Sequence, residues 1–251
     1  MEVDGVPKTG AGVIGNSPRV AVLAFHKVGP PPPGQPSSWF YISQAVFENV
    51  LAWLQTNSWR VISQEEFLHG LDVPENLAHR SALITFDDGY RSLRDVALPV
   101  LRSYGLPSVV FLPVDYVGST NRFDAGVEAE EPVCDWHDLE ELQRGGMSIQ
   151  SHSASHPHLS TLDDAQIQYE IEHSKLTIES RLQTAVQAFS FPYGDNGRDP
   201  RRTSSILRSA GYSAAFLYGG GVLTFPPSDR FGLHRLAMGP DTDLAAALET
   251  T

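Results

Sequence analysis

Short apolar runs alternate with longer segments of mixed polarity along most of the chain. The runs have the length and composition of buried strands, and the longer segments carry apolar residues at helical spacing. The predicted strands are 19–25, 59–62, 82–86, 107–112, 147–150, 186–191, 212–217 and 233–238, and the predicted helices are 44–55, 64–71, 93–101, 135–142, 163–182 and 200–210. This alternation predicts an α/β fold, either a parallel α/β barrel or a distorted version of one.

Local signals mark the ends of several of these elements. Ser43 and Ser63 are typical N-caps for the helices that follow them. Pro99 lies inside the segment 93–101, where it predicts a kink or an irregular turn. The proline-rich stretch 28–38 and the acidic stretch 113–133 have no period, and we expect both to be irregular loops.

Composition and charge narrow the class of protein. The apolar fraction of 41% is ordinary for a globular protein, and the length suits one domain, which we expect at 19–251. Residues 1–18 are polar and glycine-rich, and we expect them to form a flexible N-terminal tail. The net charge of −12 argues against nucleic acid as a partner and favours a neutral polymer or a small molecule. Cys134 is the sole cysteine, which excludes an intrachain disulfide. The sequence does not indicate an oligomeric state.

No stretch is apolar and long enough to span a membrane, and the first residues lack the apolar centre of a secretion signal. The sequence therefore predicts a soluble protein. A cytoplasmic location would follow only if the sequence is complete.

Two adjacent carboxylates, Asp87 and Asp88, follow the predicted strand 82–86 and precede Gly89. In barrel-like α/β folds, the edge where parallel strands end is where sites are built. Neighbouring carboxylates at that edge suggest that one binds a cation and the other moves a proton. The alternative is that Asp88 only caps the following helix.

His152 and His156 follow another predicted strand, 147–150, so their side chains would emerge at the same edge as Asp88. A His-x-x-x-His pattern alone is usually structural. Combined with a carboxylate at the same edge, it favours a three-ligand site that leaves positions open on Zn²⁺ or a similar divalent ion.

Two further candidates are weaker when taken alone. His26 ends the predicted strand 19–25 and could supply a proton to a leaving group, although a buried histidine is more often only hydrogen-bonded. The turn formed by Phe191, Pro192, Tyr193 and Gly194 could present a backbone N–H to an oxyanion, or could be an ordinary turn.

Taken together, these motifs resemble those of the polysaccharide deacetylase family (carbohydrate esterase family 4, with the NodB homology fold). The motifs are 85–89, 152–156 and 191–194, and the early segment 25–28 is similar to the permuted branch of poly-N-acetylglucosamine deacetylases. The resemblance covers residues 20 to about 238. It implies a distorted (β/α)7-type barrel, with 19–251 as one catalytic domain. It also implies metal-dependent removal of acetyl groups from N-acetylated sugars.

The resemblance also implies roles for individual residues. Asp87 corresponds to the general base, and Asp88, His152 and His156 to the ligands of a divalent ion, Zn²⁺ first, with Co²⁺, Ni²⁺ or Mn²⁺ as alternatives. His26 corresponds to the general acid, and the backbone N–H of Tyr193 to a hydrogen-bond donor to the oxyanion. The suggested substrate contacts are Tyr193, Trp136 and Pro192.

Two departures from the family pattern leave questions open. Many members have an arginine before the Pro-Tyr-Gly turn that pairs with the catalytic aspartate, whereas Ser190 and Phe191 stand here. His234, followed by Arg235, is held in reserve as an alternative general acid. Two other functions also remain open: an O-acetyl esterase acting on xylan, and a catalytically silent carbohydrate-binding protein on the same scaffold.

Overall fold

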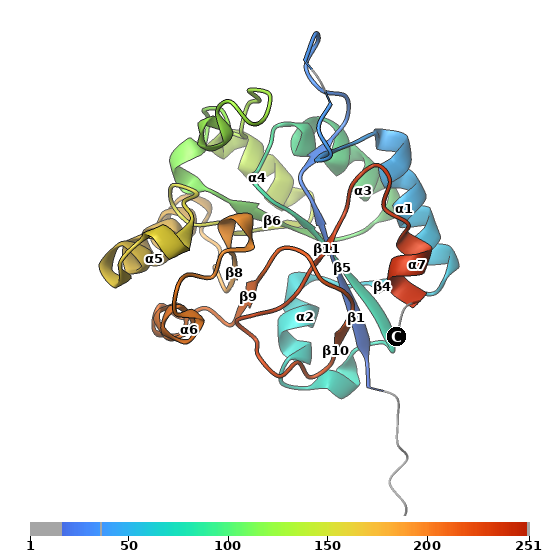
Figure 1. Ribbon diagram of the computed structural model, residues 1–251. Coiled ribbons are helices and arrows are strands. Elements are labelled where there is room, and N and C mark those ends of the chain that lie inside the picture. Colours follow the sequence, from blue (N-terminus) through green and yellow to red (C-terminus); the bar gives the residue numbers. More distant parts are fainter. Residues whose placement is uncertain (1–16, 36, 250–251) are drawn as a thin grey trace, which may run out of the picture.

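The computed structural model describes residues 17–35 and 37–249, and a curled, mainly parallel sheet forms its centre (Figure 1). The strand order along the sheet is β10-β1-β5-β6-β7-β8-β9, with β4 paired to β5 and β11 paired to β1. The strands are β1 (Arg19–Phe25), β4 (Arg60–Val61), β5 (Arg80–Phe86), β6 (Ser108–Leu112), β7 (Met147–Ser151), β8 (Ala188–Ser190), β9 (Ala214–Phe216), β10 (Leu223–Thr224) and β11 (Leu236–Ala237). Within this sheet only β10 runs antiparallel to its neighbour, among the residues described.

Side chains on alternate positions of the strands enter two different parts of the core. Val20 and Val22 of β1 share one cluster with Val109 of β6 and Phe216 of β9. Because β1 and β9 are far apart along the strand order, they can share this cluster only if the sheet curls around it. Phe67 belongs to the same cluster and fills the concave side. The predicted distorted α/β barrel is confirmed.

The helices lie mostly on the outer side of the sheet in Figure 1, apart from the one that carries Phe67, which lies against the concave cluster. They are α1 (Gln44–Thr56), α2 (Gln64–Gly70), α3 (Leu98–Tyr104), α4 (Trp136–Arg144), α5 (Asp164–Leu182), α6 (Pro200–Ser209) and α7 (Leu244–Glu249). Ser43 and Ser63 cap α1 and α2 as predicted. The irregularity expected around Pro99 is a π-helical turn, Leu93–Ala97, that leads directly into α3.

The structure differs from the sequence prediction in the short elements. The predicted loop 28–38 begins as β2 (Lys27–Val28), which pairs with β3 (Tyr41–Ile42). Neither β10 nor α7 was predicted, because both are too short for periodicity to distinguish them. The stretch 113–133 is irregular, as expected, apart from two 3₁₀ turns. Of the predicted tail, residues 1–16 lie outside the described residues.

None of the helices in the part of the chain that the structure describes is long and apolar enough to cross a membrane.

Candidate metal and catalytic site

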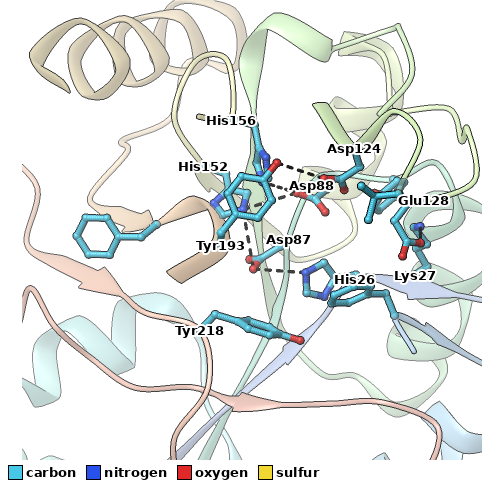
Figure 2. Close-up of a pocket in the computed structure, with 14 residues that line it drawn as sticks. His26, Lys27, Asp87, Asp88, Asp124, Glu128, His152, His156, Tyr193 and Tyr218 are labelled. Carbon is cyan, nitrogen blue, oxygen red and sulfur yellow. Dashed lines mark hydrogen bonds and ion pairs between the residues drawn. The ribbon is translucent and has the colours of Figure 1, made fainter. Parts of the chain in front are cut away.

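Six of the candidate residues meet at the edge where the parallel strands end, around a cavity of about 220 Å³ (Figure 2): His26, Asp87, Asp88, His152, His156 and Tyr193. β1 and β5 pair in register up to Phe25 and Phe86, so the next residues, His26 and Asp87, lie side by side. His152 follows β7 directly. The curled sheet therefore gathers groups that are distant in the sequence.

Asp88, His152 and His156 form a compact buried group. Asp88 Oδ1 lies 3.3 Å from His156 Nε2 and 3.6 Å from His152 Nε2, and the three potential ligand atoms all lie within 4.8 Å of one another. Asp88 Oδ1 is buried and accepts no hydrogen bond from the described residues. An unpartnered buried carboxylate oxygen is costly, and a cation between these three groups would remove that cost. The donor set fits a divalent ion.

The tautomer of His152 suits a ligand. Its Nδ1 lies 2.7 Å from the carbonyl oxygen of Ser190, which can only accept, so the ring proton is on Nδ1 and Nε2 is free. Burial lowers the pKa of His152 to about 4. The imidazole is therefore neutral near pH 7, as metal binding requires.

The loop that carries the two histidines is held by a buried carboxylate of α5. Glu170 accepts hydrogen bonds from the backbone N–H groups of Ala154 and Ser155, both at 2.8 Å, and from the Ser155 hydroxyl at 2.6 Å. His156 has a left-handed backbone with a φ of 57°, and its N–H donates to Ser153 Oγ at 3.0 Å. Such a conformation is strained for a non-glycine residue and persists only where its surroundings fix it.

Asp88 also has a left-handed backbone, with a φ of 68°, at the point where β5 turns away from the sheet. Gly89 follows with a φ of 66°, and a Cβ atom there would lie 2.6 Å from Leu112 Cδ1. Only glycine fits this turn, because a side chain would both strain the backbone and collide with β6.

Asp87 is paired with an arginine that sequence analysis noted only as the neighbour of His234. Arg235 is fully buried, and its two terminal nitrogens donate to the two oxygens of Asp87, each at 2.7 Å. It also donates to Ser190 Oγ at 2.8 Å and to the carbonyl oxygen of Leu217 at 2.9 Å. The arginine missing before the Pro-Tyr-Gly turn is thus replaced by Arg235, which directly precedes β11.

This pairing sets the charge of Asp87. Burial alone would raise its pKa, but the positive charge of Arg235, with a contribution from His152, outweighs burial and holds the pKa below its ordinary value. Asp87 is therefore ionised near pH 7, and its Oδ2 lies 4.0 Å from both His26 Nε2 and His152 Nε2. It lies beside Asp88, His152 and His156 with its orientation fixed by Arg235.

The two candidate general acids are in different places. The His26 ring lines the cavity between Phe40 and Tyr218, and burial lowers its pKa. His234 is exposed, does not line the cavity, and has its Nδ1 3.2 Å from the carbonyl oxygen of Gly219. The geometry favours His26.

The substrate contacts suggested from sequence are only partly at the cavity. Tyr193 lines it, with its ring 4.6 Å from that of His156 and its hydroxyl 3.2 Å from Asp124 Oδ1. Pro192 is buried behind Tyr193 and does not line the cavity. Trp136 is also absent from the lining; it begins α4 and packs 5.6 Å from the Arg181 guanidinium. The suggested contacts of Trp136 and Pro192 therefore have no support from the cavity.

Sequence analysis did not identify three charged residues that line the cavity: Lys27, Asp124 and Glu128. Lys27 is 2% exposed; its ammonium lies 2.8 Å from Glu128 Oε2 and about midway between the rings of Tyr41 and Tyr90, at 4.5 and 4.7 Å. Asp124 and Glu128 both come from the acidic loop, which had no periodicity to mark them. The one sequence feature that could have pointed to Asp124 and Glu128 is the high proportion of acidic residues in this loop.

Two curated proteins are similar to this chain over most of its length. The "Putative polysaccharide deacetylase YxkH" of Bacillus subtilis is 27% identical over 227 residues, covering 88% of this chain and 72% of that protein. A poly-beta-1,6-N-acetyl-D-glucosamine N-deacetylase of Staphylococcus aureus is 21% identical, covering 80% of this chain and 69% of its own length.

Among solved structures, the Streptococcus pyogenes deacetylase PplD in complex with acetate has a TM-score of 0.79 at 20% identity, covering 93% of this chain and 100% of that one. IcaB from Ammonifex degensii has a TM-score of 0.76 at 23% identity, covering 93% of this chain and 96% of that one. At these identities, the two structures show that the fold is shared.

The sequence profile described as "Polysaccharide deacetylase" matches residues 75–215, which is more than half of the chain and includes Asp87, Asp88, His152, His156 and Tyr193. The family and the enzyme class predicted from the motifs are confirmed. This chain belongs to the polysaccharide deacetylase family.

Proposed function

We propose that this protein is a metal-dependent hydrolase that removes the acetyl group from N-acetylglucosamine units of a polysaccharide or oligosaccharide. One observation carries the proposal: Asp88, His152 and His156 converge on one point beside Asp87, a carboxylate that is ionised, oriented and outside that trio. The Staphylococcus aureus relative, a poly-beta-1,6-N-acetyl-D-glucosamine N-deacetylase, supports N-acetylglucosamine as the sugar.

Asp88, His152 and His156 would hold the ion, with Zn²⁺ first and Co²⁺, Ni²⁺ or Mn²⁺ as alternatives. When bound there, such an ion polarises the acetamide oxygen and acidifies a water molecule. The side chains that do not bind it carry the remaining steps.

Asp87 acts as the general base and accepts a proton from the attacking water, while Arg235 keeps both of its oxygens in place. The backbone N–H of Tyr193 donates to the oxyanion that develops on the acetyl group. Tyr193 has a left-handed backbone with a φ of 58°, in a turn closed by hydrogen bonds from Gly194 N–H to the Phe191 carbonyl at 2.9 Å and from Asp195 N–H to the Pro192 carbonyl at 3.0 Å.

His26 protonates the departing nitrogen. Because burial lowers its pKa, the imidazole is neutral near pH 7 in the free protein, so it first takes up the proton that Asp87 accepted from the water. Its Nε2 lies 4.0 Å from Asp87 Oδ2, and its ring lines the cavity, so it can pass a proton between the base and the bound substrate. The water oxygen is added to the acetyl carbon and the C–N bond breaks. The products are acetate and a free amino sugar, and the proton taken by Asp87 balances the proton given by His26.

The test is acetate release from an N-acetylglucosamine oligosaccharide by protein first stripped of metal with a chelator and then resupplied with each of the four ions. We expect no release from the stripped protein and recovery with at least one ion. Acetylated xylan serves as the second substrate. Faster release from xylan would show an O-acetyl esterase, and no release with any ion would show a binding protein without turnover.

A further inference from the structure

One buried polar group at the cavity has no role in the steps above. The Tyr218 side chain lines the cavity, and its hydroxyl oxygen is buried without a hydrogen-bond partner among the described residues. Buried hydroxyl groups in native proteins are almost always partnered. An unpartnered hydroxyl on a side chain that lines a ligand cavity indicates that the ligand supplies the partner.

We propose that Tyr218 is a substrate-binding residue whose hydroxyl hydrogen-bonds a ring hydroxyl of the sugar that carries the acetamido group. This inference rests on the proposed function. It assigns the residue that recognises the sugar, whereas the groups described above act on its acetyl substituent.

The backbone places Tyr218 at the same edge as the reacting groups. It lies two residues beyond β9, just as His26 and His152 follow β1 and β7. A Cβ atom at Gly194 would lie 3.0 Å from the backbone nitrogen of Tyr218, so the Pro-Tyr-Gly turn and Tyr218 are in direct contact. Gly194 has a φ of 70° and can make this approach because it has no side chain. The positions of Tyr193 and Tyr218 are therefore coupled.

The side chain lies beside the general acid. The Tyr218 ring meets the His26 ring edge-on, with centroids 5.4 Å apart, and the Arg235 guanidinium lies 5.8 Å from its centroid. Figure 2 shows Tyr218 on the far side of Asp87 from His156. These contacts fix the ring but leave its hydroxyl unpartnered.

This arrangement gives the substrate a direction. The acetamide oxygen belongs at the trio Asp88, His152 and His156 and at the N–H of Tyr193, and the departing nitrogen belongs at His26. The sugar ring attached to that nitrogen then lies on the Tyr218 side of Asp87. Burial raises the pKa of Tyr218, so its hydroxyl keeps its proton and can donate to a sugar oxygen across the working pH range.

The test is Tyr218→Phe, which removes one oxygen and keeps the ring. We expect KM for the N-acetylglucosamine oligosaccharide to rise roughly 3- to 10-fold, the size expected for one neutral hydrogen bond, with kcat within about twofold of wild type. The pH profile should not move. Because the hydroxyl has no partner in the free protein, the melting temperature should be unchanged or higher.

The matched control is Tyr212→Phe. The Tyr212 hydroxyl is also buried, but it donates to the carbonyl oxygen of Ile171 at 3.0 Å and does not line the cavity. Its loss should lower the melting temperature and leave KM unchanged, which is the reverse of the result expected for Tyr218→Phe.

A second measurement is independent of turnover. In an Asp87→Asn background, adding Tyr218→Phe should raise the dissociation constant of the oligosaccharide by the same factor as KM, measured by calorimetry. If wild type releases no acetate, the proposed function fails and this binding comparison still tests Tyr218. If wild type is active and Tyr218→Phe changes neither constant, the inference is overturned. A fall in kcat with a shifted pH profile would also overturn it, because Tyr218 would then act by positioning His26.

Discussion

The floor and the wall of the cavity are built in different ways. On the floor, Asp87, Asp88, His152 and His26 each follow a strand of one sheet, so backbone pairing sets their mutual positions. The wall comes from two largely irregular segments, 27–35 with 37–41 and 118–133, and no backbone hydrogen bond joins the two among the residues described. Side-chain contacts join them: Lys27 and Ser38 to Glu128, and Tyr41 to Glu131.

This difference in construction suggests that the floor carries out metal binding and proton transfer, and that the wall binds the substrate. Groups at strand ends are held by a buried sheet and can be placed with the accuracy that metal binding and proton transfer need. A wall joined by side chains can change its shape and charge without disturbing the sheet. Changes to the four floor residues should therefore affect metal binding or turnover, and changes in the wall should affect substrate affinity, as is also expected of Tyr218.

The largest effects should come from the floor itself. We expect Asp88→Ala and His156→Ala to abolish metal binding, and Asp87→Asn to keep the metal while kcat falls about a hundred- to ten-thousand-fold, because only the base is lost. Metal content after dialysis, measured by mass spectrometry beside acetate release, checks this division. Equal loss of metal in all three variants would contradict it.

Next in size is the arginine that orients the base. Arg235→Lys keeps the charge but cannot donate to both oxygens of Asp87, so kcat should fall roughly ten- to a hundred-fold with the metal retained. Arg235→Ala would leave a buried carboxylate unpaired and should lower the unfolding free energy by about 3–5 kcal/mol. Arg91→Lys is the matched control, because Arg91 pairs with Asp138 at 3.0 Å from a half-exposed position.

Arg235 also shows where prediction from sequence ends. Sequence analysis found two motifs because each follows a predicted strand: Asp87 and Asp88 after 82–86, and His152 and His156 after 147–150. Arg235 precedes β11, a two-residue strand, and reaches Asp87 across 148 positions of the chain. No local pattern encodes that pairing, since it depends on how the sheet curls.

Glu170 and the wall residues were missed for other physical reasons. Glu170 lies between Ile167 and Ile171 on the buried face of α5, and a charged residue at an apolar position was its one signal. Lys27 and Glu128 meet across 101 positions through loops with no period. The suggestion that Trp136 contacts substrate rested on resemblance alone, and it lies outside the cavity lining.

Lowering the pH should lower the unfolding free energy of the metal-free protein. His152 has a pKa of about 4 in the folded protein because it is buried, against about 6.5 when unfolded. Between these values the unfolded chain binds the proton and the folded one does not, so stability falls as pH drops from about 6.5 to 4, by on the order of 3 kcal/mol. Urea unfolding of chelator-treated protein at several pH values measures this slope. His152→Gln should flatten it, and an unchanged slope would exclude His152 as the cause.

A smaller effect is expected from the carboxylate that holds the histidine loop. In Glu170→Gln, the amide can no longer accept all the hydrogen bonds from Ala154 and Ser155, so the loop should loosen and metal affinity should fall roughly tenfold. Calorimetric titration with Zn²⁺ measures this directly. Glu172→Gln, on the same helix but bonded only to the exposed Gln168, should leave the affinity unchanged. Equal affinities in the two variants would show that the loop holds its shape without Glu170.

The smallest effect should come from the wall, and it tests the comparison most directly. Tyr41 donates to Glu131 Oε1 at 2.6 Å, and Tyr41→Phe removes this link while keeping the ring that lies 4.5 Å from the Lys27 ammonium. We expect the unfolding free energy to fall by about 1–2 kcal/mol and KM to rise about two- to threefold. Zn²⁺ affinity and kcat should stay at the wild-type values, because no strand end moves. Tyr104→Phe, an exposed tyrosine on α3, is the control and should change none of these quantities. If Tyr41→Phe weakened Zn²⁺ binding, the floor would depend on the wall, and the separation of chemistry from recognition would not hold.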